Sequence, residues 1–184
     1  MDPRREKLAN SISEIVMIVS FAMLFATLML GYTMYRLTSD SWPPMGLQRV
    51  DLLIPAFSTV VLVVSSFTLS AFNKNRLENL KSAKIALWST IVLGTVFGVS
   101  QWFLWQDLEA VGLIASEGIF QSILYGFTWI HAAHVILGWF GLLLLIPTVG
   151  NGETKVLARV GLVSKFWHFL DIVWIIMFLT IFVF

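Results

Sequence analysis

Five long apolar stretches, separated by short polar segments, make up almost the whole chain. They run at approximately 13–36, 52–72, 85–105, 119–147 and 163–184. A helix needs about 20 predominantly apolar residues to cross the roughly 30 Å hydrocarbon core of a bilayer. We therefore predict an all-α membrane protein, a bundle of five transmembrane helices that forms a single membrane domain over residues 1–184.

Basic residues are distributed unevenly between the two sides that these helices define. Ten of the twelve lie on the side of the N-terminus: Arg4, Arg5, Lys7, Lys74, Arg76, Lys81, Lys84, Lys155, Arg159 and Lys165. The other side holds Arg36 and Arg49, and its second loop is acidic, with Asp107, Glu109 and Glu117. Because Lys- and Arg-rich loops stay in the cytoplasm, the pattern predicts a cytoplasmic N-terminus and an external C-terminus.

The first apolar stretch has a basic flank like that of a signal peptide. It is longer than a signal peptide's apolar core, and no A-x-A cleavage site follows it. We expect it to be retained as a helix.

The amino-acid composition excludes several classes of function. Hydrophobic residues make up 58% of the chain, charged residues 12%, and the mean hydropathy is +0.83, which excludes a soluble domain of this size. The net charge of +1 gives no indication of a nucleic-acid partner. Cysteine is absent, so disulfides, thiolate metal sites, iron-sulfur clusters and covalently attached c-type haem are excluded.

A few polar side chains fall within the apolar stretches. They are Glu14, Gln101, His131, His134, His168 and Asp171. An ionisable group at the centre of a membrane helix costs at least about 2.5–3.5 kcal/mol on insertion scales, so each is a functional candidate. His131 and His134 are three residues apart and share one helix face, as do His168 and Asp171.

These residues fit more than one role. We interpret the histidines and Asp171 first as partners in hydrogen bonds between helices, with Trp167 and Trp174 packing against neighbouring helices. A proton relay through His168 and Asp171, a mononuclear metal site, or a haem between His168 and one of the other histidines remain alternatives.

Two segments resemble subunit III of haem-copper terminal oxidases. The first is the run from Tyr125 to Val135, with the HxxHV pattern of His131 and His134, and the second is the WHFxDxVW pattern from Trp167 to Trp174. Further matches are Trp42-Pro43-Pro44, the Ser58-Thr59 region and Gln101. The resemblance covers about Ile18 to Phe184, and it implies the five-helix form of a family whose usual form has seven helices around a lipid-filled cleft.

The resemblance implies an accessory subunit without catalytic residues, metal or redox cofactor of its own. Its partners would be subunit I, subunit II and membrane lipid, with phospholipid bound to this chain and haem and copper in the partner subunits. The complex would reduce O2 and pump protons in the inner (plasma) membrane of a bacterium. The electron donor, cytochrome c or quinol, stays open.

The chain departs from the family pattern at two positions. Phe21 stands where the family carries an intramembrane glutamate, and Glu14 lies on nearly the same helix face but about 10 Å closer to the cytoplasm. Leu104 replaces a second carboxylate that often follows the glutamine. Two other hypotheses remain: a subunit III relative that accompanies nitric oxide reductase, and a stand-alone b-type cytochrome.

Overall fold

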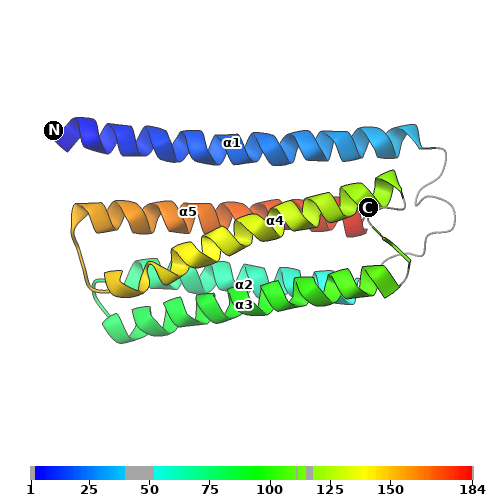
Figure 1. Ribbon diagram of the computed structural model, residues 1–184. Helices are drawn as coiled ribbons and strands as arrows, with labels where there is room; N and C mark the ends of the chain where they lie inside the picture. The colour runs from blue at the N-terminus through cyan, green and yellow to red at the C-terminus, as the bar shows by residue number, and fades with distance from the viewer. Residues whose placement is uncertain (1–2, 40–51, 111, 115–117, 184) are drawn as a thin grey trace.

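Five long helices form the molecule in a computed structural model that describes residues 3–39, 52–110, 112–114 and 118–183 (Figure 1). They are α1 (Pro3–Thr38), α2 (Leu53–Asn75), α3 (Leu80–Ala110), α4 (Ile119–Leu143) and α5 (Thr154–Met177). A 3-10 turn, η1 (Ile146–Thr148), follows α4, and a π-helical segment, η2 (Phe178–Val183), continues α5. Each long helix is apolar enough to cross a membrane, so the predicted five-helix all-α fold is confirmed. Trp42, Pro43, Pro44, Arg49 and Glu117 lie outside the described residues.

Helices α1 and α5 begin earlier than the hydropathy pattern predicts. In α5 the basic residues Lys155 and Arg159 alternate with apolar side chains, which lowers the hydropathy but leaves the helix intact. Long basic side chains can extend from a helix to the membrane surface. His168 and Asp171, expected one to two turns from the start of this helix, therefore lie near its middle.

Helix α4 ends earlier than predicted. The apolar run continues to residue 147, but the helix stops at Leu143. Pro147 explains the difference, because proline lacks the backbone N–H that a continuing helix requires and disfavours helical geometry in the residue before it. The chain instead makes the tight turns of η1, where the Thr148 amide donates to the Leu145 carbonyl at 2.9 Å.

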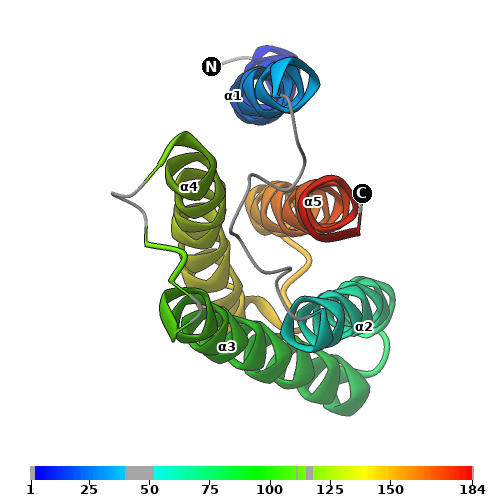
Figure 2. The same cartoon turned by 90° about the vertical axis from the view of Figure 1, so that its right-hand side faces the viewer.

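The first helix stands at the edge of the bundle. The end-on view in Figure 2 shows α2, α3, α4 and α5 grouped together and α1 to one side, next to α4 and α5. Only 11% of the most apolar window of α1 is buried, against 39% for α3 and α5. Most of the α1 surface is therefore available to lipid or to another protein.

Candidate functional site

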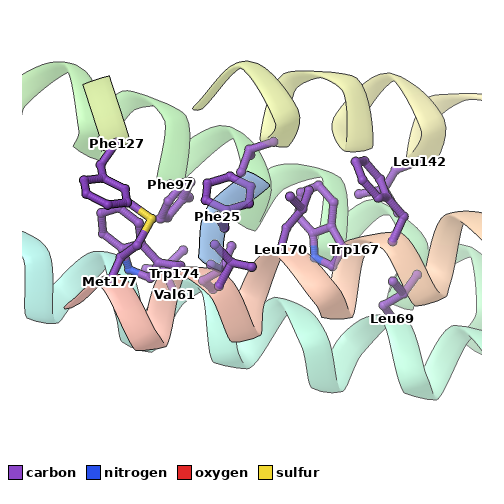
Figure 3. Packing of buried hydrophobic residues seen from close by; sticks show 14 of the residues in the cluster. Phe25, Val61, Leu69, Phe97, Phe127, Leu142, Trp167, Leu170, Trp174 and Met177 are labelled. Atoms are coloured by element: carbon purple, nitrogen blue, oxygen red, sulfur yellow. The ribbon is translucent and has the colours of Figure 1, made fainter. Parts of the chain in front are cut away.

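Trp167 occupies the space where α2, α3, α4 and α5 meet (Figure 3). Its indole N–H donates a hydrogen bond to the Ser65 hydroxyl of α2 at 3.0 Å. The ring fits because two facing positions are glycines: a Cβ at Gly94 would lie 2.9 Å from the indole, and one at Gly138 would lie 3.1 Å from it. Trp167 thus joins α5 to three other helices.

Trp174 repeats this arrangement two turns along α5. Its indole N–H donates to the Thr59 hydroxyl of α2 at 3.0 Å, and its ring meets that of Phe97 edge-on at 5.0 Å. The His131 ring of α4 also contacts it, with 5.4 Å between the ring centroids. Both tryptophans are therefore packing residues with one satisfied polar group each.

His131 lies in an aromatic enclosure. Its ring is fully buried, and Phe25 and Phe97 approach it at 6.0 and 6.1 Å in addition to Trp174. Neither ring nitrogen makes a hydrogen bond within the described part of the chain. The structure thus gives His131 ring contacts from α1, α3 and α5 in place of the interhelical hydrogen bond expected from the sequence.

His134 faces α1. Its Nδ1–H donates to the Ile130 carbonyl of its own helix at 2.6 Å, so this hydrogen bond is also not the interhelical one that we expected. The contact between helices comes from the rings: Phe21 meets the imidazole edge-on at 4.7 Å, and Phe25 does so at 5.6 Å. Phe21, where the resemblance implies a glutamate, therefore packs directly on His134.

His168 makes a hydrogen bond between helices. Its Nδ1 lies 2.5 Å from the Ser66 hydroxyl of α2. The same hydroxyl lies close to the Asp171 carboxyl, which is 4% exposed and whose oxygens make no hydrogen bond of normal geometry among the described residues. Ser66 is thus hydrogen-bonded to His168 but not to Asp171, and a relay role for His168 and Asp171 stays a prediction.

Gln101 is buried on the core face of α3. Neither amide atom has a hydrogen-bond partner in the described residues, and a buried amide of this kind costs free energy unless it is paired. Leu104, where the resemblance implies a second carboxylate, is also buried. Gln101 thus lines a cavity of about 390 Å³ between α3 and α4 whose other walls are largely apolar.

Three pairs of small polar side chains form hydrogen bonds between helices that we did not predict from the sequence. Ser58 and Ser100 lie 2.7 Å apart, Thr68 and Thr90 lie 2.8 Å apart, and Asn73 donates to Ser164 at 3.0 Å. The available signal was the occurrence of serine and threonine within apolar helices, where they commonly bond across an interface. They add to the polar contacts that fix α2 against α3 and α5.

The structure places Glu14 well inside α1 rather than at its end. Helix α1 begins at Pro3, so Glu14 lies several turns inside it and beyond the reach of the helix dipole. Its carboxylate accepts a hydrogen bond from the Lys165 ammonium of α5 at 2.7 Å. The pair joins α1 to α5 near the end of the bundle where the chain begins.

The alternative ligand sites lack the required geometry. His131, His134, His168 and Asp171 all belong to the described residues, and among these no three His, Asp or Glu side chains gather closely enough to hold a metal ion. The rings of Phe25, Phe97 and Trp174 occupy the space around His131 that a haem would need. This packing contradicts both the mononuclear site and a haem ligated by His131.

Comparison with known proteins identifies the class of molecule that has this core. A family model described as cytochrome c oxidase subunit III matches residues 8–184. The chain belongs to the cytochrome c oxidase subunit III family. A probable cytochrome c oxidase subunit 3 of Nocardia farcinica is 33% identical, with 94% of this chain and 86% of the relative covered.

Other subunit III relatives agree. The cytochrome c oxidase subunit 3 of Synechocystis is 28% identical over 91% of this chain and 72% of the relative, and that of Thermostichus vulcanus is 26% identical over 92% and 84%. The resemblance noted from the sequence is confirmed. The chain is an accessory subunit III of a haem-copper oxidase, a membrane component of a multi-subunit respiratory complex, from a family that carries no redox centre.

Proposed function

We propose that this subunit III stabilises the catalytic subunit I, and with it subunit II, of a proton-pumping oxidase in a bacterial plasma membrane. The observation that best supports this proposal is the buried core around Trp167 and Trp174. It joins four helices through tryptophan, serine and threonine contacts. Such a core makes a rigid body that supports a partner. Haem and copper, and with them O2 reduction, belong to the partner subunits.

The surface supports a partner in the membrane. Helix α1 has little buried surface, and large apolar side chains such as Met23, Leu30 and Leu53 are more than half exposed. In a bilayer these faces suit lipid and neighbouring helices equally. We also propose that this subunit supports proton uptake by the complex, and that it does so through packing. Phe21 stands where the resemblance implies an intramembrane glutamate, so that carboxylate is not available here.

Bound phospholipid is the second part of the proposal. A cleft of about 780 Å³ lies between α1 and α4, lined by apolar and small residues that include Leu28, Gly31, Ile123 and Gly126. Its size and apolar walls suit an acyl chain. The charge pattern supports an N-terminus in the cytoplasm and a C-terminus outside.

The names of the relatives favour cytochrome c as the electron donor of the complex. The subunits from Nocardia, Synechocystis and Thermostichus are all described as cytochrome c oxidase subunit 3. These names favour an oxidase over the nitric oxide reductase alternative. Sequencing the genes that flank this one tests the assignment, because a large multi-histidine membrane subunit should be among them.

The stabilising role is tested in the purified complex. His131→Ala or Asp171→Asn should reduce the amount of this subunit that remains bound, because each change disturbs the core, while the haem spectrum of the complex stays intact. Asp107→Asn, the same chemical change at an exposed position of α3, is the matched control and should retain the subunit. Loss of a haem band on either core substitution would show that this chain ligates haem, and would overturn the accessory role.

A further inference from the structure

The first part of α1 is held to the bundle differently from the rest of the helix. From Phe21 onward, ring contacts fix α1, because Phe21 and Phe25 pack on the histidines of α4 and Tyr32 is buried against the same helix. Before Phe21, no side chain from Ser11 to Ser20 is buried. We call the helical segment from Pro3 to Ser20 the arm.

One polar contact joins the arm to α5. Glu14 accepts a hydrogen bond from the Lys165 ammonium at 2.7 Å, and no other hydrogen bond or ion pair leads from the arm to another helix among the side chains that the structure describes. Met17 packs at the edge of the core. In a bilayer, apolar side chains gain little from helix association, because the acyl chains are equally apolar. The ion pair is therefore the specific attachment of the arm.

A hollow separates the arm from α5. It has a volume of about 330 Å³, and its walls are Ser13, Glu14 and Met17 on the arm and Lys155, Ala158, Arg159 and Leu162 on α5. Trp167, by contrast, fills the space between the helices that it joins. The arm and α5 are therefore loosely packed, and the arm can move without breaking a close-packed contact.

The backbone of α1 is weakened just before the ring contacts begin. The Ser20 hydroxyl donates a hydrogen bond to the Val16 carbonyl at 2.8 Å. Bonds of this kind compete with the helical hydrogen bonds and often bend a helix. Thr27 bonds to the Met23 carbonyl in the same way, but it lies beyond Phe21, where the rings hold the helix. Ser20 is thus the point at which the arm can bend.

We propose that the arm is a movable lid over the hollow and that the ion pair between Glu14 and Lys165 is its latch. With the latch closed, the arm lies beside α5, as in Figure 1. When the ion pair breaks, the arm bends at Ser20 away from α5 and opens the hollow to the bilayer. The lid is a property of this chain alone and does not rest on the accessory role.

The strength of the latch sets the size of the expected effect. An exposed ion pair typically shifts an equilibrium by about two- to five-fold, so the lid should open often enough to measure. Glu14→Gln should raise the open population by this factor. Lys155 and Arg159 share the hollow with Glu14, so Lys165→Gln leaves two cations that the carboxylate can approach and should have a smaller effect. Lys165→Arg keeps the pair and should keep the wild-type population.

Distances between spin labels on the full chain in bilayer nanodiscs test the lid. The chain has no cysteine, so two introduced cysteines define each label pair. Ser11→Cys with Ile85→Cys reports on the arm, since α3 lies across the bundle from α1 (Figure 2). Met34→Cys with Val99→Cys reports on the part of α1 that the rings hold, and all four positions are exposed. We expect a second, longer distance from the arm pair and a single distance from the other pair.

Glu109→Gln is the matched control for charge. It removes an exposed carboxylate near the end of α3, outside the hollow, and should leave the arm distances unchanged. High salt should raise the open population of the wild type but not that of Glu14→Gln, because only the wild type has an ion pair to screen. An equal effect of Glu109→Gln and Glu14→Gln would mean a general charge effect and would overturn the latch.

Three further results would overturn the proposal. A single distance from the arm pair, in the wild type and in Glu14→Gln at every salt concentration, would mean that the arm is fixed. A second distance that Glu14→Gln does not make more frequent would mean that the ion pair is no latch. Equal broadening of both label pairs in Glu14→Gln would mean that the whole bundle loosens. Failure of the accessory role appears separately, in the subunit retention and the haem spectrum of the complex.

Discussion

The ring of Phe21 on α1 meets the ring of His134 on α4 edge-on, with 4.7 Å between the centroids. Phe21 also lies 5.5 Å from Phe166 of α5, so one side chain joins α1 to the last two helices. The resemblance noted from the sequence implies a glutamate at this position in the family. If so, an aromatic contact in this chain stands where a carboxylate would face the histidine.

Phe21→Glu should lower the free energy of unfolding by about 1–3 kcal/mol, because it removes the ring contacts and buries a carboxyl group. The His134 ring contacts Phe21 and can pair with that carboxyl. In an SDS titration, His134→Ala should therefore cost more stability in the Phe21→Glu background than in the wild type. Additive effects of the two changes would mean that the histidine does not face position 21. Phe21→Leu serves as the apolar control.

Gly94 and Gly98 provide a matched pair on α3. Gly94→Ala should destabilise the protein by about 1–3 kcal/mol, because the new Cβ would lie 2.9 Å from the indole of buried Trp167. Nothing lies within 4 Å of a Cβ at Gly98, so Gly98→Ala should stay within about 1 kcal/mol of the wild type. The unfolding midpoints of the two variants in detergent give the comparison, and equal midpoints would contradict the packing of Trp167.

Trp174→Phe should cost about 0.6–2 kcal/mol through loss of the hydrogen bond to Thr59, in addition to the smaller ring volume. Thr59→Val removes the same hydrogen bond from the other side. A double-mutant cycle of the two changes isolates the bond, and its coupling energy should exceed zero by several tenths of a kcal/mol. Trp88→Phe, at a half-exposed position on α3, should have little effect on stability.

Lys165→Gln should have a small, salt-dependent effect. The Lys165 side chain is 61% exposed, and exposed ion pairs typically contribute about 0.2–1 kcal/mol. A cycle with Glu14→Gln, run at low and at high salt, should show a coupling within this range that shrinks as the salt concentration rises. A coupling that does not depend on salt would mean that the pair is shielded from solvent.

The sequence was sufficient to predict the five helices because each apolar stretch is long enough to span a bilayer. It placed the start of α5 too late, since Lys155 and Arg159 interrupt the hydropathy without interrupting the helix. The end of α4 was predictable in principle from Pro147. The predicted helix boundaries were therefore wrong where hydropathy and backbone preference disagree. Basic residues lie inside α5, and an apolar segment with a proline follows α4.

The sequence was sufficient to identify the candidate residues but not to predict their contacts. His131 and His134 share a face of α4, as predicted, yet which rings surround them depends on how α1, α3 and α5 pack. Glu14 and Lys165 are 151 residues apart, and no local pattern connects them. Helix spacing fixes which side chains share a face, whereas the partner across an interface depends on tertiary packing.

The contacts of α1 also constrain the order in which the bundle can assemble. Among the described residues, Phe21 and Tyr32 of this helix contact Phe166 and the Thr180 carbonyl of α5 and η2, and Tyr32 also meets Phe127 of α4. These partners are synthesised well after α1. During insertion α1 must therefore remain in the bilayer until α4 and α5 arrive. We conclude that the helix first translated in this bundle is among the last to dock, and that its docking completes the walls of the cleft between α1 and α4.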